Sequence, residues 1–382
     1  MIAFFIAPYL YSRYSNMYRA TKYFRYLLPP NLFATNRTKD IVHVNPVVIP
    51  LRKDVEKVQV TVYDYNATSL TEEVYNEVAP SIPFKSSNRI SWINIDGLRK
   101  KDVDHIGEHF GIHQLIAEDI LSIGQRPKMD EVENILYCLL NMLYYNDATQ
   151  TVEHEQVSIV LGHEFIITFQ EDPSRDVFNP IRDKLRIANS KLRQRGADYM
   201  CYTMIDLIVD NYFFVMEKLG DRIEQVEDEV IRNSNKRALA KINRLRKELI
   251  VLKRNIAPVR DLVGSIIRSE SELLEDATTK YFKDVHDHIS QAYDLIENYR
   301  DIMISMQDLY INNVNLRMNE VMKVMAVVTC LMAPATVIGG VFGMNFDVIP
   351  TSHNEWGFYT AVAFMLLIPV VMLFIFKRRG WF

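Results

Sequence analysis

The stretch VMAVVTCLMAPATVIGGVFGMNF, residues 324–346, decides the architecture of the chain. It contains no charged residue and exceeds the roughly 20 apolar residues that a helix needs to cross a bilayer. A second uncharged stretch, WGFYTAVAFMLLIPVVMLFIF at residues 356–376, follows after the short polar loop of residues 347–355. The sequence therefore predicts two membrane-spanning helices near the C-terminus; the alternative for each is a buried core helix.

The charges beside these stretches predict their orientation. Lys323 precedes the first stretch, and the tail of residues 377–382 begins with Lys377, Arg378 and Arg379, whereas the loop between the stretches has no Lys or Arg. Positive charge favours the cytoplasmic side of a membrane. We therefore expect a multi-pass protein of the cell (inner) membrane, with both termini in the cytoplasm and an outward-facing loop.

The average composition of the 382 residues conceals the difference between the two uncharged stretches and the charged remainder of the chain. It is 48% hydrophobic and 24% charged with a net charge of -4, as in a soluble globular protein. The near-neutral charge gives no reason to expect a nucleic-acid partner. The chain has no GxxxxGK[ST] phosphate loop, so we expect no bound nucleotide, and its three scattered cysteines form no CxxC pair.

The first 40 residues form a separate segment. A short apolar start is followed by Arg13, Arg19, Lys22 and Arg25, the reverse of the charge order in a signal peptide. The apolar part is too short to span a bilayer. We expect an interfacial or disordered extension, or a start-site artefact with Met17 as the true first residue.

The remaining chain divides into an α/β part and a helical part. Residues 41–172 contain the strand-like runs, with a helical stretch at 101–121, and residues 173–270 predict a helical hairpin with its turn at 233–235. Residues 271–323 predict a stalk helix that continues into the first span. The strand-like runs are IVHVNPVVIPL, VQVTVYD, RISWINID, ILYCLLNMLYY, VSIVLG and FIITFQ.

One face of the first span has a residue composition that a simple membrane anchor would not need. Small, polar and methionine side chains recur along it at spacings of three and four residues. Such a face either packs against another helix or lines a pore. Two spans cannot enclose a pore, so a pore requires several copies of the chain with the first spans inside. The residues are Asn319, Met322, Met325, Ala326, Thr329, Ala333, Thr336 and Gly340.

The segment FGMNF at residues 342–346 ends this face, at the end of the penultimate span. With the short acidic loop, one further span and the basic tail, it resembles the Gly-Met-Asn signature of the CorA family of divalent-cation channels. The resemblance extends from about residue 45 and includes QRPKMDEVENILY, ADYMCYTMIDLIVDNYF, YFKDVHDH and NEVMKVM. It implies a funnel-shaped homopentamer with an inner ring of first spans and passive entry of Mg²⁺ rather than an enzyme.

The resemblance assigns roles within the span. It implies a selectivity filter at Gly343, Met344 and Asn345, and a hydrophobic constriction at Met322 and Met325. Mg²⁺ releases its inner water reluctantly, so a wide ring of neutral Asn345 amide oxygens suits the hydrated ion. A further constriction position, usually a larger apolar residue in the family, is Ala333 here.

The resemblance also implies regulation by cytosolic Mg²⁺ bound between subunits. The matching acidic positions are Asp119 with its neighbour Glu118, Asp284 and Asp206. Carboxylates suit this role, because they repel one another across an interface when Mg²⁺ is scarce and are bridged by the ion when it is plentiful.

Three alternatives remain. The first is transport of another divalent cation, cobalt, nickel or zinc, by the same architecture. The segment HIGEH satisfies the H-x-x-E-H pattern of zinc metallopeptidases with His105, Glu108 and His109, although Gly107 weakens the required helix. The third is a non-conducting membrane scaffold. In addition, the stalk cluster Asp284, His286, Asp287 and His288 is a candidate transition-metal site.

Overall fold

The computed structural model describes residues 55, 57–86, 89–172, 175–232, 234–344, 354 and 356–380. The predicted extension of residues 1–40, the first strand-like run and most of the outer loop lie outside these residues. The chain divides into two units. We call residues up to 229 together with 236–305 the α/β unit, and residues 230–235 together with those from 306 onward the C-terminal unit.

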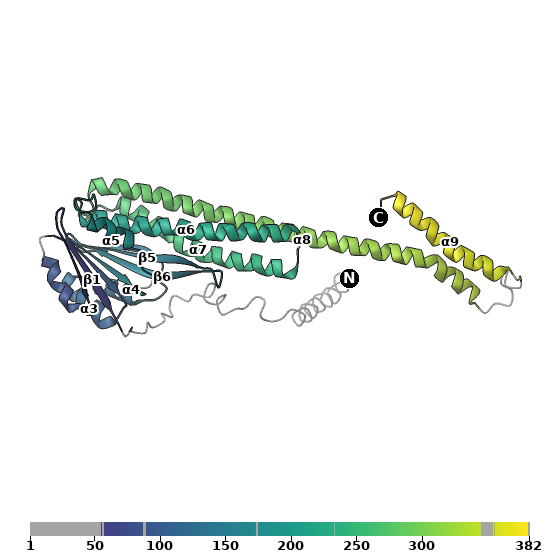
Figure 1. Cartoon of the computed structure of the whole chain (residues 1–382), viewed down its shortest axis with the longest axis horizontal. Helices are drawn as coiled ribbons and strands as arrows, with labels where there is room; N and C mark the ends of the chain where they lie inside the picture. The colour runs from purple at the N-terminus through teal and green to yellow at the C-terminus, as the bar shows by residue number, and fades with distance from the viewer. Residues whose placement is uncertain are drawn as a thin grey trace, which may run out of the picture. The chain divides into compact units, whose positions relative to one another are not determined.

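A seven-stranded mixed sheet forms the centre of the α/β unit (Figure 1). Its order is β2-β1-β3-β7-β6-β5-β4, and only β3 and β7 pair in parallel. Strands β1, β3, β5, β6 and β7 lie where the β-branched and aromatic runs predict them, whereas β2 and β4 were not predicted. They are β1 (Gln59–Tyr65), β2 (Leu70–Tyr75), β3 (Ile90–Asp96), β4 (Lys128–Val132), β5 (Ile135–Asn146), β6 (Thr151–Leu161) and β7 (Phe165–Gln170).

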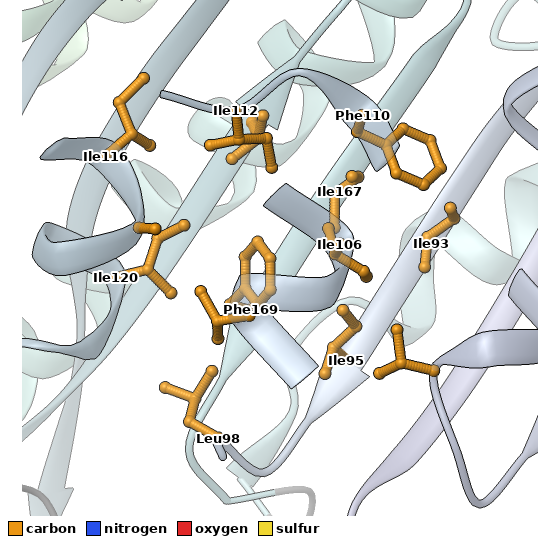
Figure 2. Packing of buried hydrophobic residues seen from close by; sticks show 14 of the residues in the cluster. Ile93, Ile95, Leu98, Ile106, Phe110, Ile112, Ile116, Ile120, Ile167 and Phe169 are labelled. Atoms are coloured by element: carbon orange, nitrogen blue, oxygen red, sulfur yellow. The ribbon is translucent and has the colours of Figure 1, made fainter. Parts of the chain in front are cut away.

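Two helices, α3 (Lys100–Phe110) and α4 (Gln114–Leu121), cover one face of the sheet. Alternate residues of β3 and β7, such as Ile95 and Phe169, pack against Ile106 and Ile120 of these helices (Figure 2). All four side chains are at most 1% exposed, so this face forms a closed apolar core.

The helical stretch predicted at 101–121 is therefore two helices. Gly111 adopts a left-handed φ of 74°, which ends α3. His113 then caps α4 by accepting a hydrogen bond from the Leu115 N–H at 3.2 Å.

Helices also cover the opposite face of the sheet (Figure 1). The hairpin predicted around residues 233–235 corresponds to α6 (Ala197–Arg232) and α7 (Lys236–Arg268), and the short α5 (Asn179–Arg186) precedes it without having been predicted. Asn141 of β5 binds both long helices, because its carbonyl accepts from the Tyr212 hydroxyl at 2.7 Å and its side chain donates to Asn255 at 2.8 Å. A 3₁₀ helix, η1 (Ala79–Ser86), also belongs to this unit.

The predicted stalk and first span form one helix. Helix α8 (Asp276–Phe342) has 67 residues and continues through Pro334, and α9 (Gly357–Arg378) follows it. Both are long and apolar enough to cross a membrane, and only 6% of the most apolar window of each is buried. The two candidate spans are thus present as helices with largely exposed side chains.

Candidate ion path and cation sites

The stripe predicted along the first span lies on an exposed face of α8. Met322 and Met325 are 61% and 65% exposed, and the other members of the stripe are exposed as well. These other members are Asn319, Ala326, Thr329, Ala333, Thr336 and Gly340. In the part of the chain that the structure describes, nothing covers this face.

A different face of the same helix is covered. Val327 is only 4% exposed, and Leu331, Pro334, Ala335 and Ile338 are half-buried. At 3.6 residues per turn, these residues share one side of α8, and the stripe lies on the opposite side.

Helix α9 approaches α8 away from the stripe. The Met365 methyl group lies 3.7 Å from the position that a Cβ atom on Gly339 would take, and Gly339 is not a member of the stripe. The second candidate span therefore leaves the stripe uncovered.

The polar groups of the stripe are uncharged, and its two threonines offer hydroxyl oxygens. The Thr329 hydroxyl donates to the Met325 carbonyl at 2.9 Å, and the Thr336 hydroxyl donates to the Met332 carbonyl at 3.0 Å. Because both donors are used within the helix, the hydroxyl lone pairs remain available to accept hydrogen bonds from water. A hydrated cation would meet acceptor oxygens on this face.

The predicted filter begins where α8 ends. Gly343 still donates its N–H to the Gly339 carbonyl at 3.0 Å, and Met344, which is 51% exposed, donates to Val341 at 3.3 Å. Asn345 lies outside the described residues. Gly343 and Met344 thus extend the end of α8, and the filter role of all three residues stays a prediction.

Asp119, on α4, forms an ion pair with a lysine of the same chain, Lys128. The Lys128 ammonium lies 2.6 Å from its carboxylate and 2.8 Å from that of Asp130, and Gln125 donates to Asp119 at 3.2 Å. Burial lowers the pKa of Lys128, but the hydrogen bonds to the two carboxylates outweigh burial and raise that pKa above its ordinary value. The neighbouring Glu118 is exposed and accepts only a long 3.4 Å hydrogen bond from Gln114.

Asp206 and Asp284 lie on α6 and α8 of the α/β unit. Asp284 is exposed, whereas Asp206 is half-buried and accepts a hydrogen bond of 3.4 Å from Tyr202. Burial, followed by the nearby Asp210 carboxylate, raises the pKa of Asp206, and the His288 imidazole offsets part of this effect.

The structure does not gather the four predicted acids into one site. Among the described residues, the one grouping of metal-ligand side chains is Asp206, Asp210 and His288, which includes neither Asp119, Glu118 nor Asp284. Asp210 was not predicted as a site residue, although its spacing of four residues from Asp206 places both on one face of a helix. Lys128 was not predicted either, because its pairing with Asp119 depends on how β4 meets α4.

Comparison with known proteins identifies the chain. Residues 87–378 match the family model described as "CorA-like Mg2+ transporter protein". The "Cobalt/magnesium transport protein CorA" of Thermotoga maritima is 37% identical over 327 residues, which cover 85% of this chain and 93% of that protein. The chain belongs to the CorA-like Mg²⁺ transporter family.

Two further comparisons extend this result. The solved structure of the CorA magnesium transporter from Methanocaldococcus jannaschii shares the fold with a TM-score of 0.70 at 23% identity, over 85% of this chain and 98% of that one. The zinc transport protein ZntB of Yersinia pseudotuberculosis is 17% identical over 78% of this chain and 89% of its own length. The CorA resemblance predicted from residues 342–346 is confirmed, and the family is one of divalent-cation transporters.

The peptidase alternative has no support in this CorA family member. His105 and His109 contact each other on α3 with ring centroids 4.7 Å apart, and the His109 ring nitrogen lies 2.9 Å from the His105 carbonyl. Within the described ranges, no metal-ligand grouping contains either histidine or Glu108. The pattern HIGEH is therefore part of a helix that packs on the sheet, and the family is one of transporters.

Proposed function

We propose that this CorA family member is a homopentameric channel that admits Mg²⁺ passively and is held closed by cytosolic Mg²⁺. The α/β unit and the stalk would lie in the cytoplasm with both termini, and α9 and the end of α8 would cross the cell (inner) membrane. Residues 324–346 and 356–376 are the corresponding spans, and residues 347–355 are the outer loop.

The exposed stripe on α8 carries this proposal. A polar and small-residue face in a lipid-embedded helix is stabilised by another helix or by water, and α9 leaves it uncovered within one chain. Several chains with α8 inside and α9 outside would give the stripe an aqueous path on the symmetry axis. The number five comes from the family resemblance.

The path suits a hydrated divalent cation. A ring of Asn345 amides, with Gly343 carbonyls beneath it, would offer neutral oxygens to an ion that keeps its inner waters. Met322 and Met325 would form the constriction where an apolar lining excludes water and ions. No fuel is needed, since 100 mV is worth about 2.3 kcal/mol per charge and about twice that for Mg²⁺.

The acidic side chains supply the proposed gate. Mg²⁺ between subunits would bridge Asp119 and Glu118 of the α/β unit to Asp206 or Asp284 of the long helices. Removal of the ion would leave like charges facing each other and separate the subunits. Lys128 already pairs with Asp119, so Mg²⁺ would have to displace this ammonium.

The filter is tested by Asn345→Ala in the full chain reconstituted into liposomes. We expect Mg²⁺ influx to fall about tenfold or more, which corresponds to roughly 1.4 kcal/mol or more of lost stabilisation in the filter. Asn354→Ala is the matched control, because it removes an exposed amide from the outer loop outside the filter. Unchanged influx in Asn345→Ala would show that the filter assignment is wrong.

The same assay decides the cargo. The names of two relatives, one for cobalt and magnesium and one for zinc, make Co²⁺ and Zn²⁺ alternatives to Mg²⁺. The family resemblance adds Ni²⁺ as a third alternative. Parallel influx measurements with the four ions would assign the channel to the ion that passes at physiological concentration. Faster passage of Zn²⁺ than of Mg²⁺ would replace Mg²⁺ in the proposal.

A further inference from the structure

The tip of the α6–α7 hairpin is attached to α8 within the C-terminal unit. The Asn313 side chain donates to the Val230 carbonyl at 3.2 Å and to the Ser234 hydroxyl at 2.9 Å. The Arg317 guanidinium donates to the Ser234 carbonyl at 3.4 Å. Val230 and Ser234 are at most 5% exposed, so the attached side of the tip is buried.

This attachment places the tip near the membrane boundary proposed above. Arg317 precedes Val324, the first residue of the uncharged stretch, by seven residues, which is about 10 Å along a helix. The headgroup layer extends roughly 5–7 Å outside the hydrocarbon core, and physiological salt screens charges over about 8 Å. The charges of the tip therefore lie within about one screening length of the lipid headgroups.

The tip and the adjoining ends of both candidate spans carry an excess of positive charge. Between residues 317 and 324 the sequence has one acid, Glu320, and the residues that follow the turn, Lys236 and Arg237, are basic. We call the exposed basic residues of the C-terminal unit at this level the juxtamembrane basic surface. They are Arg232, Arg317, Lys323, Lys377, Arg378 and Arg379.

The basic tail lies at about the same level as Lys323. The Met365 methyl group of α9 lies 3.7 Å from the position that a Cβ atom on Gly339 would take. Lys377 follows Met365 by 12 residues, and Val327 precedes Gly339 by 12. Because α9 runs back along α8 (Figure 1), equal helical rise places Lys377 near the level of Val327, about one turn from Lys323. Three separate segments thus bring positive charge to the same end of the candidate spans.

This location and charge select the ligand. Guanidinium groups bind phosphate oxygens bidentately, and each Lys or Arg near an anionic membrane surface strengthens the attraction about fivefold. We propose that the juxtamembrane basic surface, with Arg232 of the hairpin tip and Arg317 of α8 at its outer edge, binds the headgroups of anionic phospholipids.

The inference rests on the proposed position of the spans in the membrane, and it is independent of the cargo and of the gate. A lipid phosphate beside Arg232 and Arg317 would connect the hairpin tip to the segment that leads into the first span. The fraction of anionic lipid in the membrane would then affect how firmly the tip stays attached to α8.

The test measures lipid binding to the full-length protein in a neutral detergent. Native mass spectrometry gives the apparent dissociation constants of dioleoylphosphatidylglycerol, which is anionic, and of dioleoylphosphatidylcholine, which is zwitterionic. We expect the wild type to bind the anionic lipid at least about tenfold more tightly, and most of this preference to disappear in about 0.5 M ammonium acetate. Arg232→Gln should weaken binding of the anionic lipid about fivefold, and its combination with Arg317→Gln about 25-fold.

Two matched controls separate this surface from general effects. Arg254→Gln combined with Arg300→Gln also removes two exposed arginines, but Arg300 lies 24 residues before Val324, about 36 Å along α8. This variant should keep the wild-type preference. Asn313→Ala releases the tip without removing a charge and should weaken binding of the anionic lipid, whereas Asn312→Ala alters an exposed neighbour and should not.

Three results would overturn the proposal. They are equal wild-type affinity for the two lipids, an equal loss in the two double variants, and competition by inorganic phosphate as strong as by the anionic lipid, which would indicate a site for free anions. Arg232→Gln changes one exposed side chain and keeps the test valid if Arg317→Gln detaches the tip. Mg²⁺ influx of each variant is measured separately in liposomes. Loss of influx with the lipid preference intact would contradict the channel proposal, and loss of the preference with intact influx would contradict this one.

Discussion

The two units of this chain use apolar residues in opposite ways. In the α/β unit, Ile95 and Phe169 are each 1% exposed, between the sheet and its helices. In the C-terminal unit, Met325 and Phe374 are 65% and 68% exposed although their surroundings in sequence are more apolar. The first unit completes its hydrophobic core within one chain, whereas the second leaves its apolar side chains exposed, as the proposed contacts with lipid and with other copies require.

This difference also changes the meaning of the average composition. A hydrophobic content of 48% suits a soluble protein only when most of that surface is internal. Here one unit meets that condition and the other does not. The contrast can be tested by making the same substitution in both units.

The largest expected effect comes from a matched pair of phenylalanines. Phe169→Ala removes a core side chain of β7 and should lower the free energy of unfolding of the α/β unit by about 3–5 kcal/mol. Phe374→Ala on α9 should change it by less than about 0.5 kcal/mol. The measurement is urea unfolding in detergent followed by tryptophan fluorescence, to which the fully buried Trp92 contributes. An equal loss of unfolding free energy in the two variants would contradict the contrast between buried apolar side chains in the α/β unit and exposed ones in the C-terminal unit.

Much of the architecture could be predicted because it depends on local patterns. The two uncharged stretches predict the spans by length alone, and the turn at 233–235 separates two runs with helical periodicity. The β5–β6 hairpin likewise follows from two β-branched and aromatic runs, which pair from Leu136 with Leu161 to Asn146 with Thr151. The family resemblance at residues 342–346 is equally local.

The details that the sequence did not predict depend on tertiary packing. The pairing of Lys128 with Asp119 requires β4 to lie beside α4, and the meeting of Asp206 with His288 requires α6 to lie beside α8. Which side of α8 is covered depends on how α9 returns along it. No periodicity within one segment contains that information.

The second prediction concerns the exposed stripe. Met325→Ser replaces an apolar side chain in the proposed constriction, so water and ions should enter it more readily. With high Mg²⁺ on the cytosolic side, we expect the leak through reconstituted channels to rise about tenfold, equivalent to roughly 1.4 kcal/mol of barrier.

Val328→Ser is the control, because it also replaces an apolar side chain of α8 by serine but at a position outside the stripe. Val328 is 49% exposed on α8, so its substitution also places a hydroxyl on the surface of the candidate span. It should leave the leak close to that of the wild type. If both variants leak equally, the stripe does not line the ion path, and the packing-face alternative for these residues gains support.

The smallest expected effect tests the proposal that the α/β unit senses the ion admitted by the C-terminal unit. Lys128→Met removes the ammonium that lies 2.6 Å from Asp119, so Mg²⁺ would no longer compete with it. A partly exposed ion pair is worth about 0.2–1 kcal/mol, and the Mg²⁺ concentration that half-protects the full-length protein from protease should fall by up to about fivefold. Arg126→Met removes an equal charge that pairs at 3.4 Å with Asp261 instead, so it controls for the general change in electrostatic potential. An equal fall in both variants would mean that net charge, rather than direct competition at Asp119, sets the response. No fall in either would exclude Asp119 from the sensor.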